Sequence, residues 1–159
     1  MAAVKPIPDG QHSITAALVV KNARKAIEFY KTAFGAKEIS VWPGPDGRSI
    51  MHAELKIGDS KVFLGDEAPE RGAVSPQTLG GSAVSLNFFT EDCDMVFKRA
   101  IGAGATVKMA LADQFWGDRY GTVVDPFGHV WGIATHKEDV SHEEMEKRMK
   151  QTFASATRK

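Results

Sequence analysis

Two ionisable side chains stand two residues apart at His52 and Glu54, inside the strand-like run 50–57. Alternate residues of a strand point to the same face, so these two side chains are expected to lie side by side. An imidazole and a carboxylate in that arrangement could bind a divalent metal or transfer a proton, and His136 could lie nearby. The simpler interpretation, which we favour, is a hydrogen-bonded pair on a partly hydrated sheet.

A second chemically rich segment is the connection 113–120, which holds three aromatic residues, two acids, a glutamine and an arginine. An ordinary connection would use glycine and polar residues instead. In one interpretation Trp116 stacks on a planar ligand while Gln114 or Arg119 hydrogen-bonds the polar groups of that ligand. In the other, the aromatic residues fill the interior or a dimer interface, and Asp118 pairs with Arg119. The residues alone leave both open.

The elements that must position these residues occur twice along the chain. Each half has the pattern strand, helix and three strands, and the halves are offset by about 70 residues. Gly35 and Gly104 end the two helices at matched positions, and Asp125–Gly128 is typical of a tight turn. The predicted strands are 13–20, 37–42, 50–57 and 61–65 around helix 23–34, then 83–89, 106–111, 120–124 and 130–135 around a helix that starts at Cys93.

The same pattern predicts the domain organisation. Ser141 with Glu144 three residues later is typical of a helix start, and Met145, Met149 and Phe153 form an apolar stripe on the helix that follows. That helix is expected to dock on the body or on a second subunit. The predicted parts are an N-terminal arm at 1–12, one domain at 13–140 (module 1 at 13–66, linker at 67–82, module 2 at 83–140) and a C-terminal helix and tail at 141–159.

Composition limits the possible partners and location. Twenty basic residues balance twenty acidic residues, so there is no basic surface to attract nucleic acid. The sequence contains neither a signal peptide nor an apolar run long enough to cross a bilayer, so no membrane partner is expected. The single cysteine, Cys93, cannot form an intrachain disulfide and favours a reducing compartment. We therefore expect a cytoplasmic protein.

Four segments carry a resemblance to a known family: LVVKNARKAIEFYKTAFGA, MHAELKIGDSKVFLGDE, SPQTLGGSAVSLNFFTED and LADQFWGDRYGTVVDPFGHVWGIATH. Over residues 13–140 the chain resembles the PhnB-like branch of the vicinal-oxygen-chelate (glyoxalase/bleomycin resistance) superfamily. The resemblance implies an α+β fold in which two tandem βαβββ modules form a cup-shaped mixed sheet with helices outside, assembled as a homodimer. The family includes metal-dependent lyases, isomerases and dioxygenases as well as metal-free proteins that bind antibiotics, so the fold does not settle the function.

The resemblance also implies where a metal would be held. Glyoxalase I-like members use His, Gln or Glu at one position on the first strand and one on the last strand of each module. In this sequence those four positions fall at Thr15, Phe63, Ser85 and Gly132. Phenylalanine and glycine offer no ligand atom, and neutral hydroxyls bind divalent metals weakly. The sequence therefore predicts no metal or other cofactor at this site and argues against glyoxalase I activity.

The expected function is metal-independent binding of an aromatic or amphipathic small molecule in the cup. The alternative is a lyase- or isomerase-type enzyme acting on a small oxygenated metabolite, with His52 and Glu54 or a non-standard metal site there as the catalytic candidates. A third possibility is a stress-response dimer that binds another protein. Strand alternation and the aromatic connection give the candidate ligand-binding residues His52, Glu54, Phe63, Asn87, Phe89, Gln114, Trp116, Arg119 and His136. Alternation also assigns Met51, Ala53, Leu55, Ile57, Val62, Leu64, Trp131 and Ile133 to the core.

Overall fold

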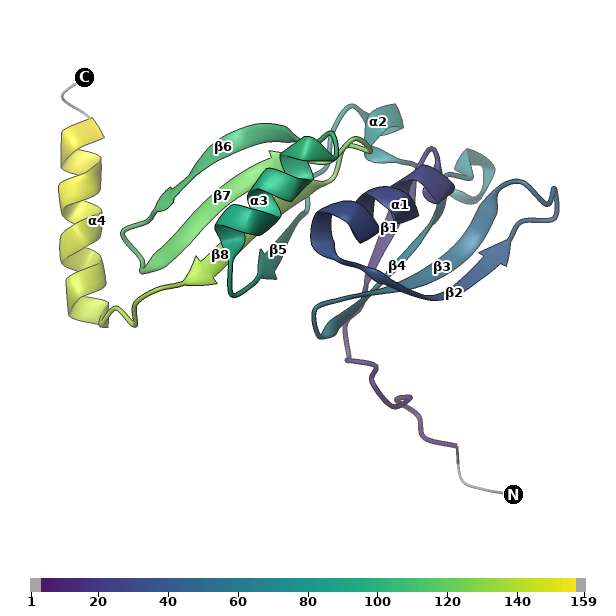
Figure 1. The fold of residues 1–159 in the computed structure, drawn as a ribbon, viewed down its shortest axis with the longest axis horizontal. Helices are drawn as coiled ribbons and strands as arrows, with labels where there is room; N and C mark the ends of the chain where they lie inside the picture. Colours follow the sequence, from purple (N-terminus) through teal and green to yellow (C-terminus); the bar gives the residue numbers. More distant parts are fainter. Residues whose placement is uncertain (1–3, 157–159) are drawn as a thin grey trace. The chain divides into compact units, whose positions relative to one another are not determined.

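The computed structural model describes residues 4–156, which form two compact units. Unit 1 contains residues 4–83 and 126–129, and unit 2 contains residues 84–125 and 130–156. Each unit has the order strand, helix and three strands that the sequence predicted (Figure 1). The fold is therefore α+β, with two βαβββ modules, and each module is built on a four-stranded mixed sheet.

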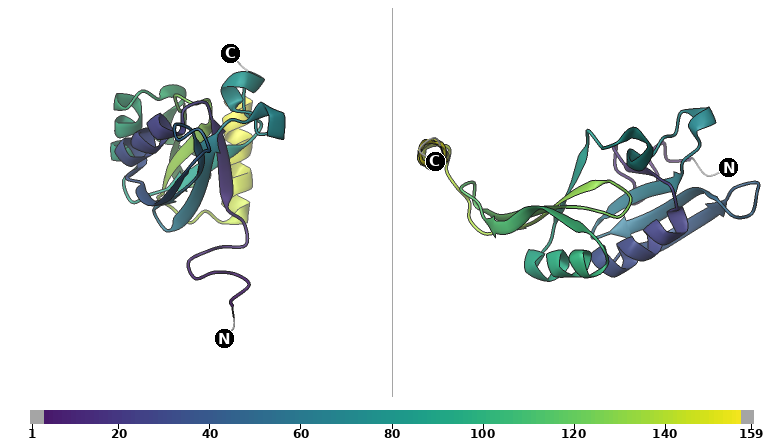
Figure 2. Two further views of the ribbon diagram at one scale, coloured as in Figure 1. Left: turned by 90° about the vertical axis from the view of Figure 1, so that its right-hand side faces the viewer. Right: turned by 90° about the horizontal axis from the view of Figure 1, so that it is seen from above.

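In unit 1 the strands lie in the order β1-β4-β3-β2. β1 and β4 are parallel, whereas the other neighbours are antiparallel. Helix α1 packs on one face of this sheet, and we call the opposite face the open face of unit 1 (Figures 1 and 2). The elements are β1 (Ala16–Val20), α1 (Ala23–Phe34), β2 (Lys37–Pro43), β3 (Ile50–Ile57), β4 (Ser60–Asp66), the 3-10 turn η1 (Pro69–Arg71) and the short helix α2 (Pro76–Leu79).

Side-chain hydrogen bonds fix the start of α1. The Asn22 side chain accepts a hydrogen bond of 3.0 Å from the backbone N–H of Lys25, which satisfies one of the free donors of the first turn. Asp66, at the end of β4, accepts from the N–H of Ala23 at 2.8 Å and from the N–H of Ile50 at 2.7 Å. One carboxylate therefore joins the helix, β3 and β4.

The core of unit 1 is completed by residues 126–129, which overlap the tight turn predicted at 125–128. Phe127 is only 7% exposed, and its ring lies 6.1 Å from that of Phe29 on α1. His129 is also buried, with its Nε2 atom 3.1 Å from the backbone oxygen of Val19. The turn is thus a part of the hydrophobic core of unit 1, although the residues on either side of it belong to unit 2.

Unit 2 repeats the arrangement, with its strands in the order β5-β8-β7-β6. β5 and β8 are parallel, and the other pairs are antiparallel. Helix α3 packs on β6, β7 and β8, and the opposite face is the open face of unit 2. The elements are β5 (Ser85–Phe89), α3 (Cys93–Gly102), β6 (Thr106–Asp113), β7 (Asp118–Val124), β8 (Val130–His136) and α4 (His142–Ala156).

The predicted C-terminal helix is α4, whose first turn is capped by Ser141. Arg148 anchors the helix: its two terminal nitrogens lie 2.8 Å from the carboxylate oxygens of Glu138, and its Nε lies 3.0 Å from Glu144. Two members of the expected apolar stripe are exposed, Met149 by 40% and Phe153 by 60%. Within residues 4–156 no helix is both long and apolar enough to span a membrane.

The predicted core is confirmed with one exception. Ala53, Leu55, Ile57, Val62, Leu64, Trp131 and Ile133 are all buried. The prediction for Met51 was wrong, because this side chain is 57% exposed and its neighbour Ile50 is buried instead. The pairing of β2 with β3 shifts register between Trp42 and Pro43. At the start of β3 this irregularity interrupts the alternation, so that the side chain of Ile50 points to the core and that of Met51 does not.

Candidate functional site

The open face of unit 1 brings three of the predicted residues together. Glu54 and Phe63 are directly paired between β3 and β4, and the ring of His52 lies 5.0 Å from that of Phe63. His52 Nε2 is 3.6 Å from Glu54 Oε1, and Lys61 Nζ is 3.7 Å from Glu54 Oε2. Both distances exceed the normal range of a hydrogen bond. Glu54 is therefore attracted by its neighbours without being fixed by them.

Trp42 extends this group on β2, where it is paired with His52 and is 60% exposed. Together with Phe63 it gives the open face of unit 1 an aromatic surface beside one ionisable pair. Such a combination can contact the flat face of a ligand and a polar group at its edge.

The open face of unit 2 brings together a second set of predicted residues. Asn87 on β5 is paired with Gly132 on β8. The hydroxyl of Tyr120, on β7, donates a hydrogen bond of 3.3 Å to Asn87 Oδ1. Phe89, two residues beyond Asn87 on the same face, is 59% exposed. Tyr120 was missed as a candidate, although extending the alternation from Asp118 along β7 would have found it.

Trp116 is oriented at the tip of the β6–β7 hairpin. Its Nε1 donates a hydrogen bond of 3.0 Å to Asp118 Oδ2, and its ring meets the ring of Tyr120 edge-on at 5.8 Å. The indole is half-buried, so a part of its surface remains accessible. Trp116 is therefore positioned beside Tyr120, whose hydroxyl in turn contacts Asn87.

His136 continues this network. Its Nδ1 lies 2.7 Å from Asp118 Oδ1, and its Nε2 lies 3.0 Å from Asp139 Oδ1. An imidazole can donate to two carboxylates at once only when both nitrogens carry a proton. These bonds, first to Asp118 and then to Asp139, raise the pKa of His136 above its ordinary value. The structure thus links His136 to Trp116 through one shared carboxylate.

Gln114 and Arg119 are placed differently from the rest. The Gln114 amide donates to the backbone oxygens of Ala112 and Tyr120, both at 3.3 Å, and so holds the hairpin together. Arg119 points to the face covered by α3, where its Nε and Nη2 each lie 2.7 Å from Asp94. This pairing lowers the pKa of Asp94.

Arg119 also contacts Asp113 at 3.2 Å, so its partners are Asp94 and Asp113 rather than Asp118, its partner in one of the two interpretations of the sequence. The structure does not bring Arg119 together with Trp116, and a role for it in ligand binding stays a prediction.

The side chains at the four positions expected to hold a metal do not fit one. In the sheet registers Phe63 pairs with Ala17, and Gly132 pairs with Asn87. Thr15 and Ser85 therefore lie two residues before the direct partners of Phe63 and Gly132. A methyl group added to Gly132 would lie 2.6 Å from the Tyr120 hydroxyl and closer still to Asn87 Oδ1. Glycine supplies no ligand atom there, and a longer side chain would displace Asn87 and Tyr120 from their observed positions. In the part of the chain that the structure describes, no group of three or more His, Cys, Asp or Glu side chains is arranged to hold a metal.

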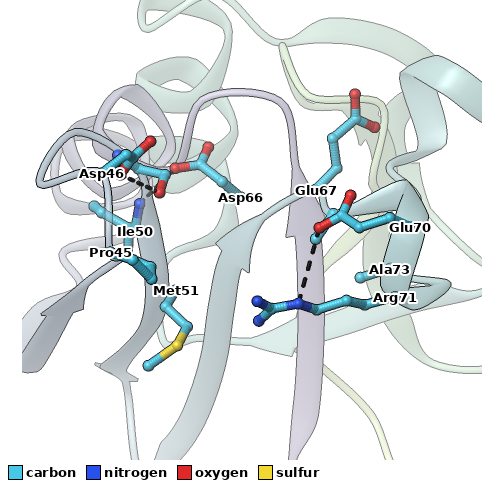
Figure 3. A pocket seen from close by; sticks show the side chains of 12 residues that line it. Pro45, Asp46, Ile50, Met51, Asp66, Glu67, Glu70, Arg71 and Ala73 are labelled. Carbon is cyan, nitrogen blue, oxygen red and sulfur yellow. Dashed lines mark hydrogen bonds and ion pairs between the residues drawn. The ribbon is translucent and has the colours of Figure 1, made fainter.

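Two hollows lie away from most of these residues. One, of about 470 Å³, lies in unit 1 between the β2–β3 turn and the segment after β4. Figure 3 shows the side chains that line it. Its acids are engaged locally: Asp46 accepts hydrogen bonds from Ser49 and the backbone of Arg48, which lower its pKa, and Arg71 lies 3.8 Å from Glu70. The other hollow, of about 290 Å³ in unit 2, includes Gln114 among its lining residues. The open faces, not these hollows, carry most of the predicted binding residues.

Comparisons with known proteins agree with this fold. The profile of the Glyoxalase/Bleomycin resistance protein/Dioxygenase superfamily matches residues 11–133. A protein of Mycobacterium bovis is 44% identical over 135 residues, which cover 83% of this chain and 88% of the relative. The crystal structure of TioX from Micromonospora sp. ML1 is similar with a TM-score of 0.61 and 27% identity, covering 79% of this chain and 98% of TioX. A PhnB protein from Bacillus cereus, with a TM-score of 0.60, 17% identity and coverages of 78% and 99%, is similar in fold.

Proposed function

This chain belongs to the Glyoxalase/Bleomycin resistance protein/Dioxygenase superfamily, and on that premise we propose that it binds a planar aromatic or amphipathic small molecule without a metal. The main support for the proposal comes from the side chains that pack around Gly132. At a position where metal-binding relatives are expected to present a ligand, this chain has a glycine covered by Tyr120 and Asn87. The corresponding position of unit 1 is Phe63, which also lacks a ligand atom.

The residues near Phe63 and Gly132 could stack on an aromatic ligand. Trp116 and Phe89 in unit 2, and Trp42 and Phe63 in unit 1, present aromatic surface on the open faces. Aromatic contacts of this kind are worth about 0.5–1.5 kcal/mol each beyond simple burial. Polar groups lie beside these rings, Glu54 in unit 1 and Asn87 and Tyr120 in unit 2, where they could hydrogen-bond the edge of a ligand.

The enzyme alternative has less support. A general base must lie within hydrogen-bond reach of the proton that it abstracts, and a hydrogen-bonded partner often orients it. His52 and Glu54 are the nearest such pair on the open face of unit 1, and their closest atoms are 3.6 Å apart. Binding needs no such alignment and is the function that the geometry supports better.

The proposal is tested by calorimetric titration with anthracene-2-sulfonate, a planar aromatic anion. We expect saturable binding that Trp116→Ala weakens by about 1 kcal/mol or more, or roughly fivefold, whereas Trp116→Phe retains most of it. Parallel titration with Zn²⁺ and Ni²⁺ should show no stoichiometric site at Thr15, Phe63, Ser85 and Gly132. The proposal is wrong if the aromatic probe fails to bind, or if a stoichiometric metal is needed for binding.

His52→Ala separates the two functions. A binding protein should lose affinity modestly, whereas an enzyme that uses His52 for proton transfer should lose about 10²-fold or more in rate. The affinity of His52→Ala for anthracene-2-sulfonate is the first measurement. A loss of all binding in His52→Ala would contradict the role proposed for Trp116.

A further inference from the structure

We infer that Tyr120 and Asn87 form a hydrogen-bond donor pair that recognises an oxygen acceptor, such as a carbonyl or quinone oxygen, on the bound aromatic ligand. This inference rests on the proposed binding function and specifies the ligand further. The pair occupies the place beside Gly132, so it would hold the ligand oxygen where related proteins use a metal. The ligand class is a planar aromatic compound with an oxygen acceptor at its edge.

Close packing defines the position of the pair. A methyl group on residue 132 would lie 2.6 Å from the hydroxyl and 2.7 Å from the Cε2 atom of Tyr120, whereas real Cβ atoms essentially never approach so closely. The phenol therefore lies directly over the backbone of Gly132 and uses the space of the missing side chain. Only glycine permits this, which ties the residue at 132 to the placement of the phenol.

The hydrogen bond within the pair is long. Tyr120 donates to Asn87 Oδ1 at 3.3 Å, whereas hydroxyl donors normally lie 2.5–3.0 Å from an oxygen acceptor. A hydroxyl held this loosely can turn toward a better acceptor at small cost. When Asn87 accepts through Oδ1, its NH₂ group keeps two further donors, and the side chain is exposed. Both residues can therefore donate to the same incoming oxygen.

The aromatic neighbours preorganise the pair. Trp116 contacts the Tyr120 ring edge-on at 5.8 Å, and Trp116 is itself held by Asp118 at 3.0 Å. Phe89 lies two residues beyond Asn87 on the same strand face and is 59% exposed. A flat ligand that lies against these rings would present its edge to Tyr120 and Asn87. Side chains already held in the bound geometry lose less entropy when the ligand arrives.

Two matched probes test the inference. Anthraquinone-2-sulfonate and anthracene-2-sulfonate share ring system and charge, but only the former has carbonyl oxygens. We expect the wild-type protein to bind the quinone more tightly, by roughly threefold to tenfold, as one or two net hydrogen bonds allow. Tyr120→Phe and Asn87→Ala should each reduce that preference and leave the affinity for the anthracene nearly unchanged. Ser85→Ala, which removes an exposed hydroxyl two residues from Asn87, should alter neither.

The possible outcomes distinguish a failure of the donor pair from a failure of the proposed binding function. If both probes bind the wild-type protein equally, or if Tyr120→Phe weakens them equally, the donor pair is refuted and aromatic binding stands. If neither probe binds, the proposed function itself is wrong and the inference falls with it. Near-ultraviolet circular dichroism of each variant checks that the fold is retained, and Asn87→Ala provides an independent test should Tyr120→Phe perturb the sheet.

Discussion

Replacing Phe127 by alanine tests how much unit 1 depends on the turn at 126–129. The side chain is 7% exposed, and its ring lies 6.1 Å from Phe29 and 6.3 Å from Tyr30. Truncation of a buried phenylalanine costs about 3–5 kcal/mol, because burial is lost and a cavity remains. Both neighbouring rings belong to α1, so that helix should report the loss.

Hydrogen exchange measured by mass spectrometry gives the required local resolution. A difference of 1.4 kcal/mol corresponds to about tenfold in an equilibrium constant. In Phe127→Ala the amides of α1 should therefore exchange roughly 10²- to 10³-fold faster, or lose protection altogether. Phe127→Leu fills more of the space, so its exchange rates in α1 should lie between those of Phe127→Ala and those of the wild type.

Phe89→Ala is the matched control, because it removes the same ring from a side chain that is 59% exposed. Its effect on the protection of β5 should be less than about tenfold. The argument would be refuted if α1 in Phe127→Ala exchanged within about threefold of the wild-type rate, since the ring would then contribute little to the core.

Three further predictions follow from contacts in unit 2. The bond of His136 to Asp118 raises the pKa of the histidine in the folded protein. The stabilisation of the fold by this bond is therefore fully present below about pH 6.5 and is lost as the pH rises through the folded-state pKa. In urea unfolding from about pH 6 to about pH 9, the difference in free energy of unfolding between the wild type and His136→Gln should disappear. Arg148→Ala removes the double contact with Glu138 and should increase hydrogen exchange throughout α4. We propose that the chain forms a homodimer through the exposed apolar stripe of α4. Sedimentation of the wild type should give twice the monomer mass, and Met149→Glu should lower the sedimenting mass toward that of the monomer. A wild-type protein that sediments as a monomer would contradict the proposal.

The fold could be predicted from the sequence because its signals are local and occur twice. Glycines at 35 and 104, alternating apolar residues and matched turns all act over a few residues, and the repeat makes each half a check on the other. The core positions on β4 and β8 followed from alternation alone. Met51 was misplaced because it is the extra residue where Trp42 pairs with His52 and the next residue, Pro43, pairs with Ile50, and such a bulge interrupts the alternation that the sequence argument used.

The candidate site was predicted in part for the same reason. Alternation placed His52 and Glu54 on one face and Asn87 and Phe89 on one face, as observed. The shorter of the two ion pairs of Arg119 is with Asp94, 25 residues away along the chain, and tertiary packing brings these two side chains together. Patterns over a few residues cannot rank such long-range partners.

The turn at 126–129 also has a consequence for how the chain is made. The other residues of unit 1 end at residue 83, so a ribosome must add about forty more residues before Phe127 can enter that core. During this interval the nascent first module would present an incomplete hydrophobic interior. A gene fragment that stops at the linker would lack the same ring, so dividing this protein between its two sequence repeats would not yield two self-sufficient halves.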